Sequence, residues 1–296
     1  MFRLLEDRLK PLKLGLPGQQ KVRNMSAKIE RELWCSPNDA LKFISSLRAE
    51  PGGIVGVDTD SLGRLRWVMW STAEQLVLAR RFGDIITLDI TFLTTRYGMK
   101  LCVFIGVDSE NKTAILAQGF LADEPTDPFE FALKHLIKAC EGHPKVIITD
   151  DQPAIADAVK HILPNTKHLH CLWHVFENVK ELCRGSLKPV LLRLLKTAAV
   201  ALSEDAFNDV WAEIKVVVNG SKCEGYITGH LFNQRAYWAR CNHPTAMTLN
   251  MTSSSRAEGI LGIIKQGRLV NSRTSLIHVK NELDKWVADL ASATGL

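Results

Sequence analysis

The chain has 296 residues, 46% of them hydrophobic and 23% charged, and a net charge of +5. This composition is ordinary for a globular protein with one large domain or two small ones. It excludes a membrane span, because no apolar run reaches about 20 residues. We also expect no secretory signal, since MFRLLEDRLKPLKLG lacks a long apolar stretch. Seven widely spread cysteines favour a reducing compartment over a disulfide framework.

The first segment, residues 1–37, is predicted to be a basic N-terminal arm. Residues 1–32 hold eight Lys or Arg against four acids, which is compatible with a polyanionic partner. Two interpretations stay open: an arm that touches nucleic acid, or a solvated terminus, which is the simpler of the two.

Residues 38–82 predict a lead-in helix and a hairpin. The helix in DALKFISSLRAEPGG ends at Pro51-Gly52-Gly53, and alternating apolar residues flank a turn at Asp60-Ser61-Leu62-Gly63. Residues 73–82 have helical spacing.

Residues 83–185 form the most regular block. Strand patterns at 85–91, 99–107 and 113–121 are joined by short turns and predict an antiparallel meander. Helices and strands then alternate, in the order helix 128–140, a strand ending at Asp150, helix 154–163, strand 167–173 and helix 174–183. The block predicts an α/β fold with a mixed sheet and helices on its faces.

The rest of the chain reads as helical. Residues 186–250 predict an all-helical insertion, with helices at 191–203, 206–218 and 230–240. Residues 251–296 predict two closing helices, in SSSRAEGILGIIKQ and SLIHVKNELDKWVADL.

Two carboxylates stand out in the apolar strands. Asp89 lies within ITLDITF, and Asp150 ends VIITD. A buried ionised Asp is costly unless it is paired or binds a metal, so Asp89 is either a salt-bridged core residue or a ligand. Asp150 favours the ligand interpretation, because sites in α/β sheets form at the carboxyl ends of strands. Such a pair suits Mg²⁺ or Mn²⁺. For the adjacent Asp151 we expect an N-terminal helix cap.

Three motifs occur together in order: Asp89 in its strand, Thr149-Asp150, and Leu163-Pro164 followed by Cys171-Leu-Trp-His174. With them, residues 83–180 resemble the transposase domain of Mutator-like elements (MULE), and also the plant far-red-impaired-response regulators derived from such transposases. The resemblance implies a ribonuclease-H-like fold and a DDE transposase that cleaves DNA and transfers strands. It further implies two Mg²⁺ or Mn²⁺ ions, transposon-end and target DNA as partners, and a nuclear location.

The resemblance also implies a third acidic ligand beyond the helical insertion. MTSSSRAEGILGIIK matches the family's helix and assigns that role to Glu258. The family's Asn four residues further on is replaced by Gly262, so an exposed Glu258 paired with Arg256 or Lys265 stays an alternative. Metal ligation is thus expected from Asp89, Asp150 and Glu258.

The Cys171 and His174 pair is half of a structural zinc site. Only the weak Cys241-Asn-His243 offers a second half, so we do not expect zinc. The resemblance places this pair in the transposase core, where it would steady DNA or the catalytic strand. We expect His168 and His170 to be partly exposed strand residues.

Three tryptophans admit two interpretations. Trp173, Trp211 and Trp238 could stack on an unpaired base, but tryptophans at amphipathic positions are more often core anchors.

Rival functions stay open. Flanking DNA-binding modules that often accompany this family are not recognised, which leaves open a truncated or inactive copy. The alternatives are a domesticated, non-catalytic regulator that binds DNA and a ribonuclease-H-like nuclease without transposition. A homodimer is also left open.

Overall fold

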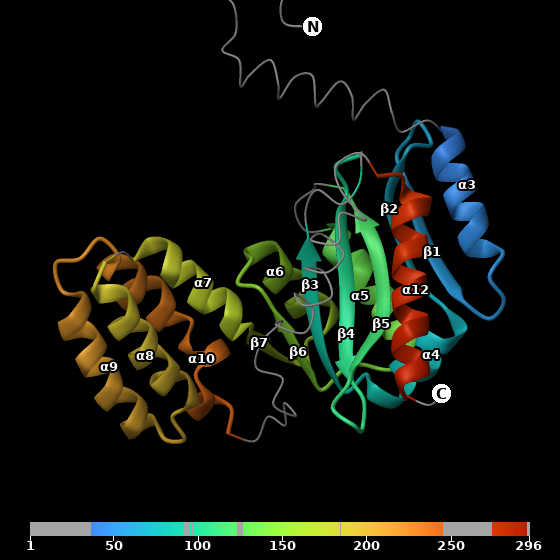
Figure 1. Ribbon diagram of the computed structural model, residues 1–296. Helices are drawn as coiled ribbons and strands as arrows, with labels where there is room; N and C mark the ends of the chain where they lie inside the picture. The colour runs from blue at the N-terminus through green and yellow to red at the C-terminus, as the bar shows by residue number, and fades with distance from the viewer. Residues whose placement is uncertain are drawn as a thin grey trace, which may run out of the picture.

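The computed structural model describes residues 37–91, 95, 97–122, 127–183, 185–244 and 274–294. They form a mixed α/β body around one sheet, with a helical region beside it (Figure 1). The strands are β1 (Ile54–Thr59), β2 (Leu65–Ser71), β3 (Ile85–Thr91), β4 (Lys100–Val107), β5 (Thr113–Leu121), β6 (Val146–Thr149) and β7 (Lys167–His170). The helices of the α/β body are α3 (Pro37–Arg48), α4 (Ala73–Phe82), α5 (Asp127–Cys140), α6 (Pro153–Ile162) and α12 (Leu276–Thr294).

The sheet has seven strands in the order β1-β2-β5-β4-β3-β6-β7. Strands β3, β4 and β5 form an antiparallel meander, and β6 and β7 continue from β3 in parallel. This confirms the predicted mixed sheet. The bounds of β3 and β5 agree with the sequence patterns, and β4 starts one residue later than expected.

The β1–β2 hairpin belongs to the same sheet, because β2 pairs antiparallel with β5. Gly119 permits this pairing. A Cβ atom at Gly119 would lie 2.1 Å from Met69 Sδ and 2.3 Å from the Val68 carbonyl oxygen, so a larger residue would push β2 away. The sequence predicted the hairpin but gave no sign of its partner strand.

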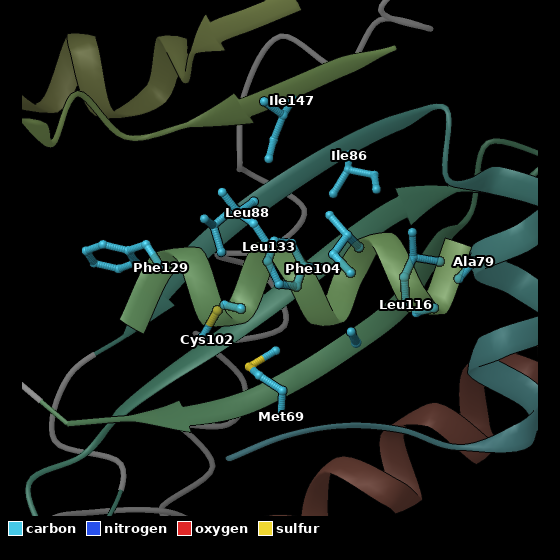
Figure 2. Close-up of a cluster of buried hydrophobic side chains, with 14 of the residues drawn as sticks. Met69, Ala79, Ile86, Leu88, Cys102, Phe104, Leu116, Phe129, Leu133 and Ile147 are labelled. Carbon is cyan, nitrogen blue, oxygen red and sulfur yellow. The ribbon is translucent and has the colours of Figure 1, made fainter. Parts of the chain in front are cut away.

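Helices cover both faces of the sheet. On one face, α4, α5 and α6 bury a large apolar cluster, and Figure 2 shows Phe129 and Leu133 of α5 among side chains such as Leu88 and Phe104 from the strands. On the other face, α3 and α12 pack over Leu101, Val103 and Ile105 of β4 and their neighbours. The central strands β4 and β5 are buried almost throughout because both faces are covered.

The helical region has its own core. Its elements are α7 (Leu172–Leu182), α8 (Leu187–Val200), α9 (Glu204–Val218), the π-helix η2 (Tyr226–Leu231), α10 (Arg235–Trp238) and the 3₁₀-helix η3 (Arg240–Asn242). Their apolar faces meet in one cluster, and the region extends from the β7 edge of the sheet (Figure 1). No strand occurs within the described residues 185–244, as the pattern predicted.

The expected helix at 230–240 is instead broken into the end of η2, α10 and η3. The indole Nε1 of Trp238 donates a hydrogen bond to the Leu231 carbonyl oxygen at 2.9 Å, a contact that a continuous helix would not make. The boundaries of the predicted domains stay a prediction, and the arm at 1–36 lies outside the described residues. No helix in the described parts of the chain has the length and hydropathy that a membrane crossing requires.

Candidate active site

Asp89 lies near the carboxyl end of β3 and is 6% exposed. Its neighbours Leu88 and Ile90 point to the face covered by α5, so Asp89 points to the opposite face. There it stands opposite Val103 of β4 in the antiparallel register. Its Oδ1 accepts a hydrogen bond from the Ile90 backbone N–H at 2.8 Å. The strand therefore presents a carboxylate, between Thr87 and Thr91, on the face opposite α5.

Asp150 directly follows β6, the parallel neighbour of β3. The register pairs Thr87 with Ile148, and two residues further along both strands the same alignment brings Asp150 beside Asp89. Asp150 Oδ1 accepts a hydrogen bond from the Asp151 N–H at 2.7 Å, the same local geometry that Asp89 has. The two carboxylates that the sequence singled out thus share one end and one face of adjacent strands.

Such a pair carries an electrostatic cost. Neighbouring strands lie about 4.8 Å apart, and two unit charges at that distance repel by roughly 3 kcal/mol at an effective dielectric constant of about 20. A cation between the carboxylates would offset this repulsion. Oxygen ligands of this kind favour Mg²⁺ and Mn²⁺ over softer metals.

Histidine 174 supplies a positive charge at the same place. Helix α7 has Cys171 as its N-cap, and His174 lies one turn into the helix. Burial by itself lowers the pKa of His174, but the hydrogen bond to Cys171 and the charges of Asp150 and Asp89 raise this pKa to about 9. His174 is therefore an imidazolium at neutral pH, beside both carboxylates.

The start of α7 differs from the prediction. The expected strand at 167–173 ends at His170, and the helix begins at Leu172, not at His174. The physical reason is the position of Cys171. Its backbone N–H still donates to the Thr149 carbonyl oxygen at 2.8 Å, while its own carbonyl oxygen accepts from the Val175 N–H at 3.1 Å. One residue thus completes the sheet and starts the helix, which local pattern could not indicate.

Asp151 is not the helix cap that we expected. The N-cap of α6 is Gln152, and it makes no side-chain capping bond. Asp151 instead binds His230 of η2, with 2.5 Å between Oδ2 and Nε2, and its Oδ1 lies 3.8 Å from His170 Nε2. Alternation along the chain places Asp151 on the opposite side from Asp150, so the two adjacent acids have different partners.

Around Asp151 lies a cluster of rings that the sequence did not predict. Tyr237 of α10 stacks on His170, with centroids 4.8 Å apart and planes at 9°, and Tyr226 stacks on His230 at 5.3 Å. His170 is buried, at 4% exposure, contrary to expectation, because Tyr237 covers it. We call His168, His170, His230, Tyr226, Tyr237 and Asp151 the histidine cluster. It joins the helical region to the edge of the sheet.

His168 is held neutral in this cluster. Its Nε2 lies 2.8 Å from the Thr149 hydroxyl, which itself donates to the Asp150 carbonyl oxygen at 2.8 Å. Because a hydroxyl has one proton, Nε2 of His168 is the donor in their contact. Burial and the neighbouring His170 lower the pKa of His168 to about 4, although Asp151 acts in the other direction. The alternation of Thr149 with Asp151 and of His168 with His170 was the one sequence signal for this cluster.

The third predicted ligand cannot be placed beside the pair, since Glu258 lies outside the described residues. Within the described ranges, no group of three or more His, Cys, Asp and Glu side chains is arranged to hold a metal ion. Asp89 and Asp150 remain the described residues whose positions and chemistry fit a divalent cation.

The three tryptophans differ in how much of each side chain is exposed. Trp211 and Trp238 are 3% and 2% exposed, which confirms them as core anchors of the helical region. Trp173 is 37% exposed and lies in the first turn of α7, next to His174.

The fold and this site define a class: a mixed α/β domain with two carboxylates at the ends of adjacent parallel strands. Comparison with known proteins makes the class more specific. Residues 85–178 match the family model described as the MULE transposase domain. The match includes Asp89, Asp150, Cys171 and His174.

Curated relatives come from Arabidopsis thaliana. The chain is 27% identical over 225 residues to Protein FAR-RED IMPAIRED RESPONSE 1. This alignment covers 74% of this chain and 27% of the relative. It is 26% identical over 245 residues to Protein FAR1-RELATED SEQUENCE 4, covering 80% of this chain and 32% of the relative. The chain thus spans roughly a third or less of the length of these relatives. Residues 85–178 are thus related to the MULE transposase domain, and the chain is similar to proteins of the FAR1 type, as its motifs predicted.

Proposed function

We propose that this chain carries a DDE-type transposase domain that performs metal-dependent phosphoryl transfer on DNA. The observation that supports this most strongly is the parallel register of β3 and β6, which pairs Thr87 with Ile148 and, continued by two residues, aligns Asp89 with Asp150. The two acids lie side by side at the ends of adjacent strands, an arrangement whose negative charge a bound cation would offset.

The fold supports the same proposal. A three-strand antiparallel meander is followed by two parallel strands, with one Asp on the first strand and the other after the fourth. We propose that this is a ribonuclease-H-like sheet. The helical region lies in sequence between Asp150 and Glu258, as the resemblance to MULE transposases requires.

In the proposed reaction, water first cleaves DNA at an element end, and the freed 3′-OH then attacks target DNA. Asp89 and Asp150, with Glu258 as the third acid, would hold two Mg²⁺ or Mn²⁺ ions, which activate the attacking oxygen and stabilise the leaving one. His174, charged and next to the carboxylates, would hold a DNA phosphate near the pair. Cys171 orients His174 through their hydrogen bond. We propose a nuclear location for this reaction.

A second candidate is a non-catalytic regulator that uses the same fold to bind DNA. The relatives described above favour it, because their names are of the FAR1 type and not those of transposases. The two candidates share DNA as the partner and differ in whether the acidic residues are needed for bond cleavage.

The test is cleavage of supercoiled plasmid in Mg²⁺ or Mn²⁺, followed by joining of a labelled oligonucleotide with a free 3′-OH. We expect nicking by the wild type, and at least about a hundredfold loss in Asp89→Asn and Asp150→Asn. Asp205→Asn, an exposed acid on α9, is the matched control and should nick like the wild type. DNA binding without nicking in either metal would contradict the catalytic proposal and support the regulator.

A further inference from the structure

Trp173 is an exposed aromatic side chain in a place where burial would be expected. Among the tryptophans whose side chains the structure describes, Trp67, Trp70, Trp211 and Trp238 are 7% exposed or less, whereas Trp173 is 37% exposed. An indole that is 37% exposed leaves in water part of the apolar surface that a core position would bury. Exposed aromatic residues of this kind are typical of binding surfaces.

The orientation of this indole is fixed on one side. The ring of His174 lies against it, with centroids 4.9 Å apart and planes at 89°. Such an edge-to-face contact is favourable for aromatic rings. The contact also places the indole against His174, whose side chain lies near Asp89 and Asp150. Trp173 is therefore both exposed and near the proposed reaction centre.

We propose that Trp173 is a stacking platform for an unpaired base of the DNA strand that enters the active site. This rests on the proposed function, because it takes DNA as the ligand and the carboxylate pair as the reaction centre. For cleavage near an element end, a DNA strand must reach Asp89 and Asp150, which lie beside the helical region. An unpaired nucleotide can approach more closely than a continuous duplex, and base stacking on an aromatic ring is tolerant of sequence.

The test uses 2-aminopurine, a fluorescent base whose emission falls when it stacks on an indole. It is placed in a three-nucleotide unpaired bubble within an oligonucleotide duplex, and a fully paired duplex of the same sequence serves for comparison. Titrations with the full chain are made in EDTA. Without divalent metal no phosphoryl transfer occurs, so the outcome does not depend on whether the chain nicks DNA.

We expect the wild type to quench the bubble probe and to bind it more tightly than the duplex. Trp173→Ala should lose the quenching and bind the bubble about tenfold more weakly, with duplex binding changed less than twofold. Trp173→Phe, which keeps a ring, should retain most of the preference. Leu182→Ala is the matched control, since Leu182 is 46% exposed at the far end of α7, and it should behave like the wild type.

Near-ultraviolet circular dichroism of each variant establishes that it is folded. Quenching that persists in a folded Trp173→Ala would overturn the proposal, as would equal losses in Trp173→Ala and Leu182→Ala. An absence of quenching in the wild type would also overturn it. If the wild type nicks plasmid in Mn²⁺ yet shows no quenching, the stacking proposal fails while the proposed function stands.

Discussion

The two sides of the β6 carboxyl end use neighbouring acids in opposite ways. On one side, Asp150 lies beside a second carboxylate, Asp89, and a charged His174. On the other side, Asp151 is bound to His230, and His170 and Tyr237 complete a stack of rings. The adjacent residues Asp150 and Asp151 thus belong to two different places. Asp150 lies in the charged site, and Asp151 lies in the contact that holds the helical region to the sheet.

The two sides of the β6 end are suited to different roles. A carboxylate pair with a shared electrostatic cost is suited to exchange a bound cation, because ligand binding relieves the repulsion. A carboxylate that already has a histidine partner is suited to a permanent structural contact. The same polar residue types therefore serve binding on one face and attachment on the other.

The largest effect that we expect concerns pH, because the two sides hold histidines of opposite character. The pKa of His168 is lowered to about 4, below the ordinary 6.5, so the unfolded chain binds more protons between these values. The stabilisation from neutral His168 is complete above pH 6.5 and is lost as the pH falls toward 4. It amounts to about 3 kcal/mol.

Urea unfolding of the wild type and of His168→Gln, measured from pH 7 to pH 4, isolates this contribution from those of other histidines. The variant keeps a donor for Thr149 but cannot titrate, so its stability should fall less steeply with acid. His174 should show the reverse in NMR titration, with protonation retained at pH 7.5. Parallel pH profiles of the two proteins would show that His168 is not held neutral.

A smaller effect separates the adjacent acids. Asp151→Asn should lower the free energy of unfolding by about 1 to 2 kcal/mol, because it removes the charge that binds His230. Asp150→Asn should change the free energy less than Asp151→Asn does, because relief of the repulsion with Asp89 offsets the lost attraction to His174. Urea denaturation at pH 7 measures both. Equal destabilisation by the two substitutions would remove the distinction between the two sides.

The smallest effect concerns the stack on His170. Tyr237→Ala should cost about 1 kcal/mol through loss of the ring contact. Tyr237→Phe keeps the ring and should stay within about 0.5 kcal/mol of the wild type. Thermal unfolding compares the two variants. A Phe variant as unstable as the Ala variant would show that the phenol oxygen, and not the ring, holds the joint.

Much of the sheet was predictable from the sequence, because alternation and turn residues are local signals. The meander of β3, β4 and β5 and the strand that ends before Asp150 follow from them. The spacing of the strands along the sequence could not predict the register of β3 with β6, which aligns Asp89 with Asp150. That alignment is a long-range property of the fold.

The role of Asp151 and the break in the helix at 230–240 were not predicted, because both depend on partners that are distant in the chain. Asp151 was predicted to cap a helix because it begins the turn before the next helix, yet its partner His230 is 79 residues away. Residues 230–240 have helical periodicity, but the helix breaks where Trp238 binds Leu231 and Tyr237 meets His170. Local propensity could not indicate either contact.

Calorimetric titration with Mn²⁺ tests the claim that Asp89 and Asp150 form one cation site. The wild type is titrated with and without duplex DNA, beside folded Asp89→Asn, Asp150→Asn and Asp205→Asn variants. We predict that binding weakens by about a hundredfold in both of the first two variants, and is unchanged in Asp205→Asn. Equal binding by the wild type and both pair variants, with DNA present as well as absent, would contradict the claim.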